Sequence, residues 1–160
     1  MPIRIFTTGG TIDKVYFDAL SEFEIGASPV AELLREAHFG LPFVVTPLMR
    51  KDSLELTDED REVIRAAVAG CAEERVLVTH GTDTMPVTGR LLQSIADKTI
   101  VLTGAMLPAS QRSSDAFFNV GFAMAALQTL PKGVYITMGG QIFDPARTHK
   151  DRANHRFVQD

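Results

Sequence analysis

The chain is poor in several features, and each scarcity excludes a class of protein. Cysteine occurs only at Cys71, so no internal disulfide forms, which suits a reducing compartment. A basic surplus is also missing, since 16 Lys and Arg face 20 Asp and Glu, a net charge of −4. Binding to nucleic-acid phosphates needs such a surplus, so we expect no nucleic-acid partner. No apolar run approaches the length that spans a bilayer, and we expect no membrane partner.

Several familiar catalytic and metal-binding motifs are absent as well. The chain has no GxSxG turn of an α/β-hydrolase, no HExxH zinc motif and no cysteine pair. Its four histidines are scattered at His38, His80, His149 and His155. We therefore expect no metal site, and we interpret His80 as a support of the sheet edge through a hydrogen bond.

The remaining composition is that of one soluble globular domain. Apolar residues make up 45% of the 160 residues and charged residues 22%, so a core can form without disulfide bonds. Repeats, low-complexity tracts and linkers are missing, and we predict one domain over residues 1–160. The N-terminal MPIRIFTTGG passes directly from an apolar run to a turn, without a signal peptide, and so predicts a cytoplasmic protein.

Short apolar runs alternate with longer amphipathic segments along the chain. They predict strands at residues 3–7, 43–45, 75–79, 99–103 and 133–138, and helices at residues 30–38, 57–70, 84–96 and 115–130. Continuous apolar strands that alternate with helices are typical of a parallel sheet covered on both faces. The predicted fold class is therefore α/β, doubly wound, with a mainly parallel sheet. After a short strand that ends at residue 145 the pattern fades, and composition alone predicts a frayed terminus.

Three of the predicted strands lead into small residues and hydroxyls. The segments are TTGGT at residues 7–11, HGTDTM at 80–85 and GAM at 104–106. Because ligands bind beyond the carboxyl ends of strands in an open parallel sheet, these loops predict a site for a small polar or anionic ligand. A phosphate or nucleotide site is the weakest interpretation. TTGGT lacks the GK[ST] ending of a P-loop, and Asp13 follows it closely.

Hydroxyl side chains at this edge offer a second interpretation, nucleophilic catalysis. Thr11 and Thr82 follow different strands, and Asp83 lies beside Thr82. Threonine is a weak nucleophile that needs a base, and Tyr16 and Lys150 would complete proton-transfer chains if the fold brings them close. A lysine acts as a base only where it is desolvated or crowded. Each residue alone is typical of a cap or a turn, so only their combination indicates chemistry.

These segments resemble the signatures of the bacterial-type L-asparaginases, a family that includes the glutaminase-asparaginases. TTGGTI at residues 7–12 is similar to the first signature and HGTDTM at 80–85 to the second. Shorter matches are VLTGAMLP at 101–108, SDAFFN at 114–119, the DS pair within KDSLELT, and RTHK near the C-terminus. The segments occur in the expected order and cover nearly the whole chain.

The resemblance implies hydrolysis of L-asparagine to L-aspartate and ammonia without a cofactor, with minor action on glutamine. It also gives Lys150 a place in the site, in contrast to the frayed terminus that composition predicts. The implied catalytic set is Thr11 as nucleophile, Tyr16 as assisting proton acceptor, and Thr82, Asp83 and Lys150 as a second cluster for proton transfer. The implied substrate-binding set is Gly10, Asp52, Ser53, Gly81 and Ala105, with Ser53 and Gly81 on the carboxylate. Asp83 would also pair with the substrate's ammonium group. Which threonine attacks first stays open.

The chain departs from the full-length family pattern in one respect. Those relatives carry a second, C-terminal domain, and a neighbouring subunit's copy supplies an acidic group to the substrate's amine. This sequence resembles the first domain alone, as a short-chain asparaginase or a fragment would, and we expect no C-terminal domain. The segment 115–130 is apolar around nearly its whole circumference. We therefore predict a homodimer or homotetramer with this helix at or near an interface.

A catalytically silent amino-acid-binding or regulatory module is the alternative function. Such a module would keep the ligand loops without turnover. The set of Thr11, Thr82, Asp83 and Lys150 favours the enzyme, because binding alone does not need that lysine.

Overall fold

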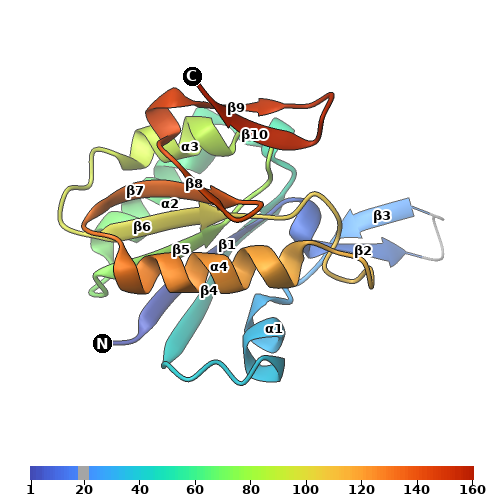
Figure 1. Ribbon diagram of the computed structural model, residues 1–160, viewed down its shortest axis with the longest axis horizontal. Coiled ribbons are helices and arrows are strands. Elements are labelled where there is room, and N and C mark those ends of the chain that lie inside the picture. The colour runs from blue at the N-terminus through green and yellow to red at the C-terminus, as the bar shows by residue number, and fades with distance from the viewer. Residues whose placement is uncertain (18–21) are drawn as a thin grey trace.

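Figure 1 shows the computed structural model, which describes residues 1–17 and 22–160. Within these residues the main sheet has six strands in the order β4-β1-β5-β6-β7-β8. Neighbours pair in parallel except for the last strand, β8, which pairs antiparallel with β7. The strands are β1 (Ile3–Gly9), β4 (Phe43–Lys51), β5 (Arg75–Thr79), β6 (Thr99–Thr103), β7 (Gly133–Met138) and β8 (Gln141–Phe143).

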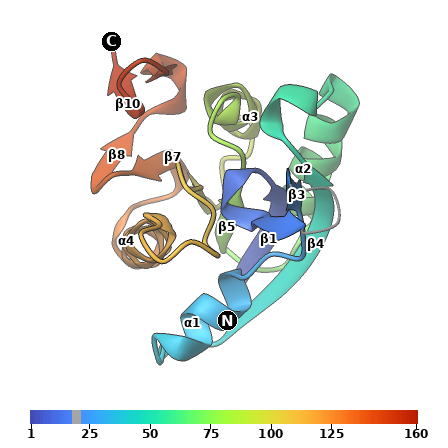
Figure 2. The same ribbon diagram turned by 90° about the vertical axis from the view of Figure 1, so that its right-hand side faces the viewer.

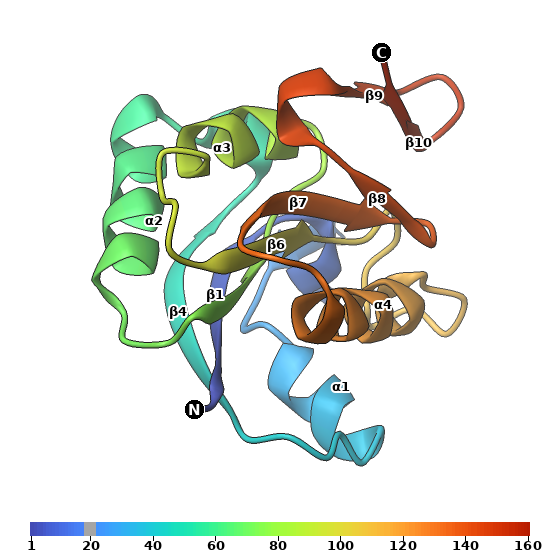
Figure 3. The same cartoon turned by 60° about the vertical axis from the view of Figure 1, so that its left-hand side comes forward.

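The α-helices cover both faces of this sheet (Figure 3). One face packs against α1 (Val30–Glu36) and α4 (Ala116–Thr129), and the other against α2 (Asp58–Gly70) and α3 (Met85–Leu92). In β5 the buried side chain of Leu77 joins the first core, while those of Val76 and Val78 join the second. This alternation follows from the two-residue period of a strand. The doubly wound α/β fold is therefore confirmed. None of the helices in the described residues is long and apolar enough to cross a membrane.

The predicted element bounds agree best where apolar runs are short and sharply bordered. The bounds of β5, β6 and β7 are those predicted, whereas β1 and β4 run further. Helix α2 begins after Thr57, as its sequence predicts. The Thr57 hydroxyl accepts from the Asp60 amide, and the Asp60 carboxylate accepts from the Thr57 amide, which completes a capping box. Helix α3 ends at Leu92 and not at residue 96, because a tight turn follows in which the Ile95 amide donates to the Leu92 carbonyl.

The C-terminal segment is ordered, so the composition-based prediction of a frayed terminus is wrong. After the short helix η3 (Pro145–Arg147), β9 (Thr148–Asp151) and β10 (Arg156–Gln159) form an antiparallel hairpin. Phe157 is only 4% exposed, and its ring lies 6.1 Å from that of Phe143 in the core. The buried Phe157 ring and the pairing of β9 with β10 hold a segment that is otherwise polar. Its composition gave no sign of either contact.

Three shorter elements complete the description. The short helix η1 (Thr11–Asp13) follows β1, and η2 (Ser53–Glu55) follows β4. A second hairpin, β2 (Lys14–Phe17) and β3 (Glu22–Ile25), projects from the body of the molecule in Figure 1 and faces the viewer in Figure 2. Strand β1 lies between β4 and β5, so the chain passes to opposite sides of β1. Such a reversal of strand order opens a crevice at the carboxyl ends, where ligands bind in open α/β sheets.

Candidate active site

The loops after β1, β4 and β5 pack together at this reversal. Gly10 has φ +84°, and a Cβ atom added to it would lie 2.4 Å from the Cα of Gly81. A Cβ atom on Gly81 would in turn lie 2.6 Å from the Cβ of Ser53. Neither position can carry a side chain without displacing the neighbouring loop. The sequence-predicted residues Gly10, Gly81 and Ser53 are thus parts of one packed unit.

A threonine directly follows each of the two touching glycines. Thr11 opens η1 and is partly buried, and Thr82 is 4% exposed. Both lie beyond the carboxyl ends of the neighbouring strands β1 and β5. The fold therefore brings the two hydroxyl-bearing loops to one place, as the sequence predicts.

Lys150 joins Thr82 and Asp83 in a hydrogen-bonded cluster. Its Nζ lies 2.7 Å from the Thr82 Oγ1 and 3.0 Å from the Asp83 Oδ1. The Lys150 side chain is 13% exposed and that of Asp83 22%, so their charges attract with little screening. A lysine held against a hydroxyl oxygen in this way can stabilise a developing alkoxide or, once deprotonated, accept the hydroxyl proton.

The C-terminal hairpin positions this lysine. Lys150 in β9 pairs directly with Phe157 in β10. Because opposed residues of an antiparallel pair share a face, burial of the Phe157 ring also turns Lys150 toward the body of the molecule. Arg152, in the turn after β9, adds a second contact at 3.2 Å from its Nε to the Asp83 Oδ1.

Ser53 and Asp52 connect the loop after β4 to the rest of the site. Ser53 is 1% exposed, and its Oγ lies 3.3 Å from the amide nitrogen of Thr84, while its carbonyl accepts from the Thr84 hydroxyl at 2.8 Å. The Asp52 carboxylate caps η2 through the Leu54 amide and lies 3.4 Å from the Lys14 Nζ. These contacts fix Ser53 beside Gly81.

The loop after β6, which carries Ala105, is held from the start of α4. The Asp115 carboxylate accepts from the amides of Met106 and Leu107, and the Asn119 amide group donates to the Gly104 carbonyl. Ala105 itself is 1% exposed. The helix thus fixes the position of this fourth loop.

His80 supports the loop after β5, as the sequence predicts. It is fully buried, with its Nδ1 2.6 Å from the Gly81 carbonyl oxygen and its Nε2 2.8 Å from the Thr88 Oγ1. A carbonyl oxygen can only accept, so the proton lies on Nδ1, and Nε2 accepts from the Thr88 hydroxyl. Burial, with a smaller contribution from Arg61, lowers the pKa of His80 to about 4, against the opposing effect of the Gly81 carbonyl. The imidazole is therefore neutral and structural.

Tyr16 lies on the projecting hairpin. Its side chain is 53% exposed, and its ring packs edge-on against Phe23 with 5.6 Å between ring centroids. The structure thus brings Thr82, Asp83 and Lys150 together and leaves Tyr16 on β2, apart from the hairpin that carries Lys150 (Figure 1).

Sequence reasoning missed two residues of this region. Thr84 bridges to Ser53 through side chain and backbone, and Arg152 contacts Asp83. Thr84 was visible in HGTDTM, where the start of a helix was its simplest interpretation. Arg152 lies in a polar turn that carried no signal. Among the described residues, no group of His, Cys, Asp and Glu is arranged to hold a metal ion.

Comparison with known proteins agrees with the resemblance to the asparaginases seen in the sequence. The family model described as "Asparaginase, N-terminal" matches residues 2–157. The chain is 27% identical over 156 residues to an L-asparaginase of Thermococcus kodakarensis, a match that covers 94% of this chain and 48% of that protein. It is 38% identical over 85 residues to a component of the glutamyl-tRNA(Gln) amidotransferase of Methanococcus vannielii, over 52% of this chain and 20% of that one.

Solved structures agree over the whole chain. The thermostable L-asparaginase from Thermococcus kodakarensis superposes with a TM-score of 0.85 at 26% identity, over 99% of this chain and 51% of that one. The probable cytoplasmic L-asparaginase from Campylobacter jejuni gives a TM-score of 0.85 at 27% identity, over 99% and 52%. The chain thus spans about half the length of the L-asparaginases that it matches.

Proposed function

Because the chain belongs to the asparaginase family, whose N-terminal model matches nearly all of it, we propose that it is an amidohydrolase that converts L-asparagine to L-aspartate and ammonia. The observation that carries this proposal is the contact of Lys150 with Thr82 and Asp83. A partly buried lysine placed on a hydroxyl suits proton transfer, and simple ligand binding has no need of it.

Thr11 is the proposed nucleophile. Its Oγ attacks the side-chain amide carbon, and its proton passes by way of the neighbouring polar groups to the leaving nitrogen, which departs as ammonia. Water then attacks the resulting ester carbon and gives up a proton through the Thr82–Lys150 pair, which releases aspartate and restores Thr11. Amide N–H groups of the glycine loops would stabilise each oxyanion, an effect worth about 3 kcal/mol per donor in comparable enzymes. Tyr16 would assist from the β2–β3 hairpin as a proton acceptor.

The α-carboxylate and α-ammonium groups of the substrate would bind beside these residues. Ser53 and Gly81 would orient the carboxylate, and Asp83 would pair with the ammonium group. Gly10, Asp52 and Ala105 would complete the walls. No cofactor takes part in this scheme. Minor action on glutamine, a cytoplasmic location and a homo-oligomeric state belong to the same proposal.

The test is an ammonia-release assay with L-asparagine, L-glutamine and D-asparagine. We expect Thr11→Ala and Lys150→Met each to lower kcat by several orders of magnitude, because members of a coupled catalytic set fail together. Lys132→Met, on an exposed lysine outside the site, is the matched control and should retain wild-type activity. Wild-type rates in both site variants would refute the assigned roles.

A silent amino-acid-binding module is the second candidate, and one contact favours it. The Asp83 Oδ1 already lies near both Lys150 and Arg152, which leaves its charge largely compensated before any ammonium group arrives. The similarity to part of an amidotransferase also supports a role other than asparagine hydrolysis. Saturable binding of L-aspartate in calorimetry, without ammonia release from asparagine or glutamine, would establish this second function.

A further inference from the structure

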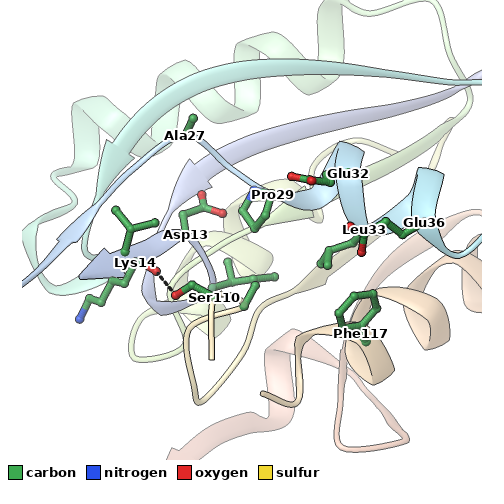
Figure 4. Close-up of a pocket in the computed structure, with 12 residues that line it drawn as sticks. Asp13, Lys14, Ala27, Pro29, Glu32, Leu33, Glu36, Ser110 and Phe117 are labelled. Carbon is green, nitrogen blue, oxygen red and sulfur yellow. Dashed lines mark hydrogen bonds between the residues drawn. The ribbon is translucent and has the colours of Figure 1, made fainter. Parts of the chain in front are cut away.

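A cavity of about 300 Å³ lies between η1, α1 and the first turn of α4 (Figure 4). Its walls come from residues within 12–15, 27–36 and 109–117. None of the residues proposed for catalysis or substrate binding is among those that line it. The volume is within the range of small-molecule pockets, so this cavity is a candidate site of its own.

Asp13 is the most unusual side chain in this cavity. The residue is 2% exposed, and its Oδ1 has no hydrogen-bond partner among residues 1–17 and 22–160. In Figure 4 its carboxyl group points toward Pro29 and Ala27, which line the same cavity. A buried carboxyl oxygen without a partner destabilises the fold, and native proteins keep few of them. A cation bound beside this carboxyl group would stabilise its ionised form.

The charge around the cavity favours a cation. Glu32 and Glu36 of α1 also line it, so three carboxyl groups face this space. Lys14 is the basic residue in the lining, and its ammonium group lies 3.4 Å from the Asp52 carboxylate. In Figure 4 that ammonium group points away from the cavity. Arg50 also acts on the Asp13 carboxyl group, so three carboxylates stand against two cations, and the net field favours a positively charged guest.

The remaining walls are apolar and are already in place. Ile12, Leu33 and Phe117 contribute hydrocarbon surface, and the Phe117 ring is half exposed, with a face available to a cation or an alkyl chain. Backbone contacts hold the walls: the Ala109 amide donates to the Ile12 carbonyl at 3.1 Å, and the Ser110 hydroxyl to the Lys14 carbonyl at 3.0 Å. A preformed site loses little free energy to ordering when it binds.

We propose that this cavity binds a small organic cation, a primary ammonium ion with an apolar side chain, and that the Asp13 carboxylate is its anionic partner. The ammonium group would lie at Asp13 and the apolar part against Leu33 and Phe117. This proposal does not rest on the amidohydrolase assignment, because the two sites share no residue and ligand binding is measured without turnover.

Benzylammonium chloride is the probe for the test, titrated calorimetrically into the full chain at pH 8. Benzyl alcohol has nearly the same shape without the charge. We expect saturable one-to-one binding of benzylammonium and at least ten-fold weaker binding of the alcohol. Asp13→Asn should weaken benzylammonium binding at least ten-fold. Asp97→Asn removes an exposed carboxylate outside the cavity and should leave affinity unchanged.

A rim variant keeps the test informative if Asp13→Asn unfolds. Glu32 is exposed on α1, so Glu32→Lys leaves the core untouched and should weaken binding at least three-fold by repulsion. Wild-type affinity in this folded variant, equal affinity for benzyl alcohol, or no saturable binding would overturn the proposal. None of these results would bear on ammonia release.

The pH dependence gives a further readout. Burial raises the pKa of Asp13 to about 7, against the opposing effects of Ser28, the Gly9 amide and Arg50. The bound cation requires the ionised carboxylate, so affinity should fall as the pH is lowered from 8 to 6. The other charged groups around the cavity, Lys14, Glu32 and Glu36, are the same in Asp13→Asn, which should lose this dependence. An unchanged dependence in that folded variant would also contradict the role of Asp13.

Discussion

Asp13, at the end of η1, and His80, directly after β5, both lie at the carboxyl edge of the sheet, and burial favours the neutral form of each. The pKa of Asp13 rises to about 7 and that of His80 falls to about 4. For Asp13 the folded chain holds its proton more tightly than the unfolded chain, so this contribution to stability is present below the unfolded pKa and is lost as the pH rises through about 7. For His80 the folded chain resists protonation, so its contribution is present above about 6.5 and is lost as the pH falls toward 4.

The two contributions therefore oppose each other between pH 4 and 7, and a substitution should separate them. Asp13→Asn removes the contribution of Asp13. The variant should therefore be more stable than wild type at pH 8, and this difference in stability should vanish near pH 4. The difference in unfolding free energy between the variant and wild type should change by about 4 kcal/mol between pH 4 and pH 8, at about 1.4 kcal/mol per pKa unit. Urea unfolding at pH 8, 6 and 4 measures it. Curves that run parallel at all three pH values would contradict the burial of an ionisable Asp13, and Asp97→Asn controls for loss of one surface charge.

Gly10 is the residue whose substitution tests the packed loops most directly. Its positive φ and its contact with Gly81 leave no room for a methyl group. We expect Gly10→Ala to destabilise the fold by about 1–3 kcal/mol and to lower any activity strongly, because the loops must separate. Gly40, where an added Cβ meets nothing within 4 Å, provides the control, and Gly40→Ala should lie within about 1 kcal/mol of wild type. Equal unfolding free energies for the two variants would show that the loops are not tightly packed.

At the scale of single residues, sequence identified the groups that carry hydroxyls, glycines and the lysine, since these form recognisable segments. It did not identify the environment of Asp13, because an unpartnered oxygen is a property of the assembled walls and not of TTGGTID. The contact of Arg152 with Asp83 was not predicted for the same reason. Its partner, Asp83, is 69 positions away in the chain, and no local pattern records that contact.

At the scale of elements, the β9–β10 hairpin links packing to the site. Phe157→Ala should destabilise the molecule by about 3–5 kcal/mol, as for other buried aromatics. If the protein is an enzyme, Phe157→Ala should also lower kcat far more than it raises KM, because Lys150 loses its position. Val158→Ala, at the next position of the same strand, is a milder control. A variant that keeps wild-type kcat would show that the hairpin does not position the lysine.

The elements also show where sequence patterns are enough to predict the bounds of a strand. Buried parallel strands are continuous apolar runs, and β5, β6 and β7 were predicted to the residue. The C-terminal hairpin was not predicted from its composition, because Phe157 is its one large buried aromatic and its partners lie in other strands. The resemblance to the asparaginases predicted a place for Lys150 in the site, which the hydrophobic periodicity of the sequence could not do.

At the scale of the whole molecule, α4 leaves apolar surface uncovered. Phe117 and Phe118 are 50% and 62% exposed, and Phe118 stacks on Phe122 with 6.3 Å between ring centroids. We predict a homodimer or homotetramer that covers this face, observable by sedimentation at micromolar concentration. Phe118→Glu should shift the chain toward monomer, whereas Val63→Ser, on an exposed residue of α2, should not. A wild-type chain that sediments strictly as a monomer would refute the prediction.

The order of the strands has a consequence for synthesis on the ribosome. The sheet from β4 to β7 is complete by Met138, yet Lys150 comes 12 residues later and must reach back to Thr82, 68 positions earlier in the chain. A nascent chain released after β7 would keep both glycine loops and lack the lysine cluster. During synthesis the residues of the loops after β1 and β5 therefore leave the ribosome first, and the proposed proton-transfer group leaves last. Because a domain generally folds as a unit, the lysine cluster can form only once the C-terminal hairpin has been made.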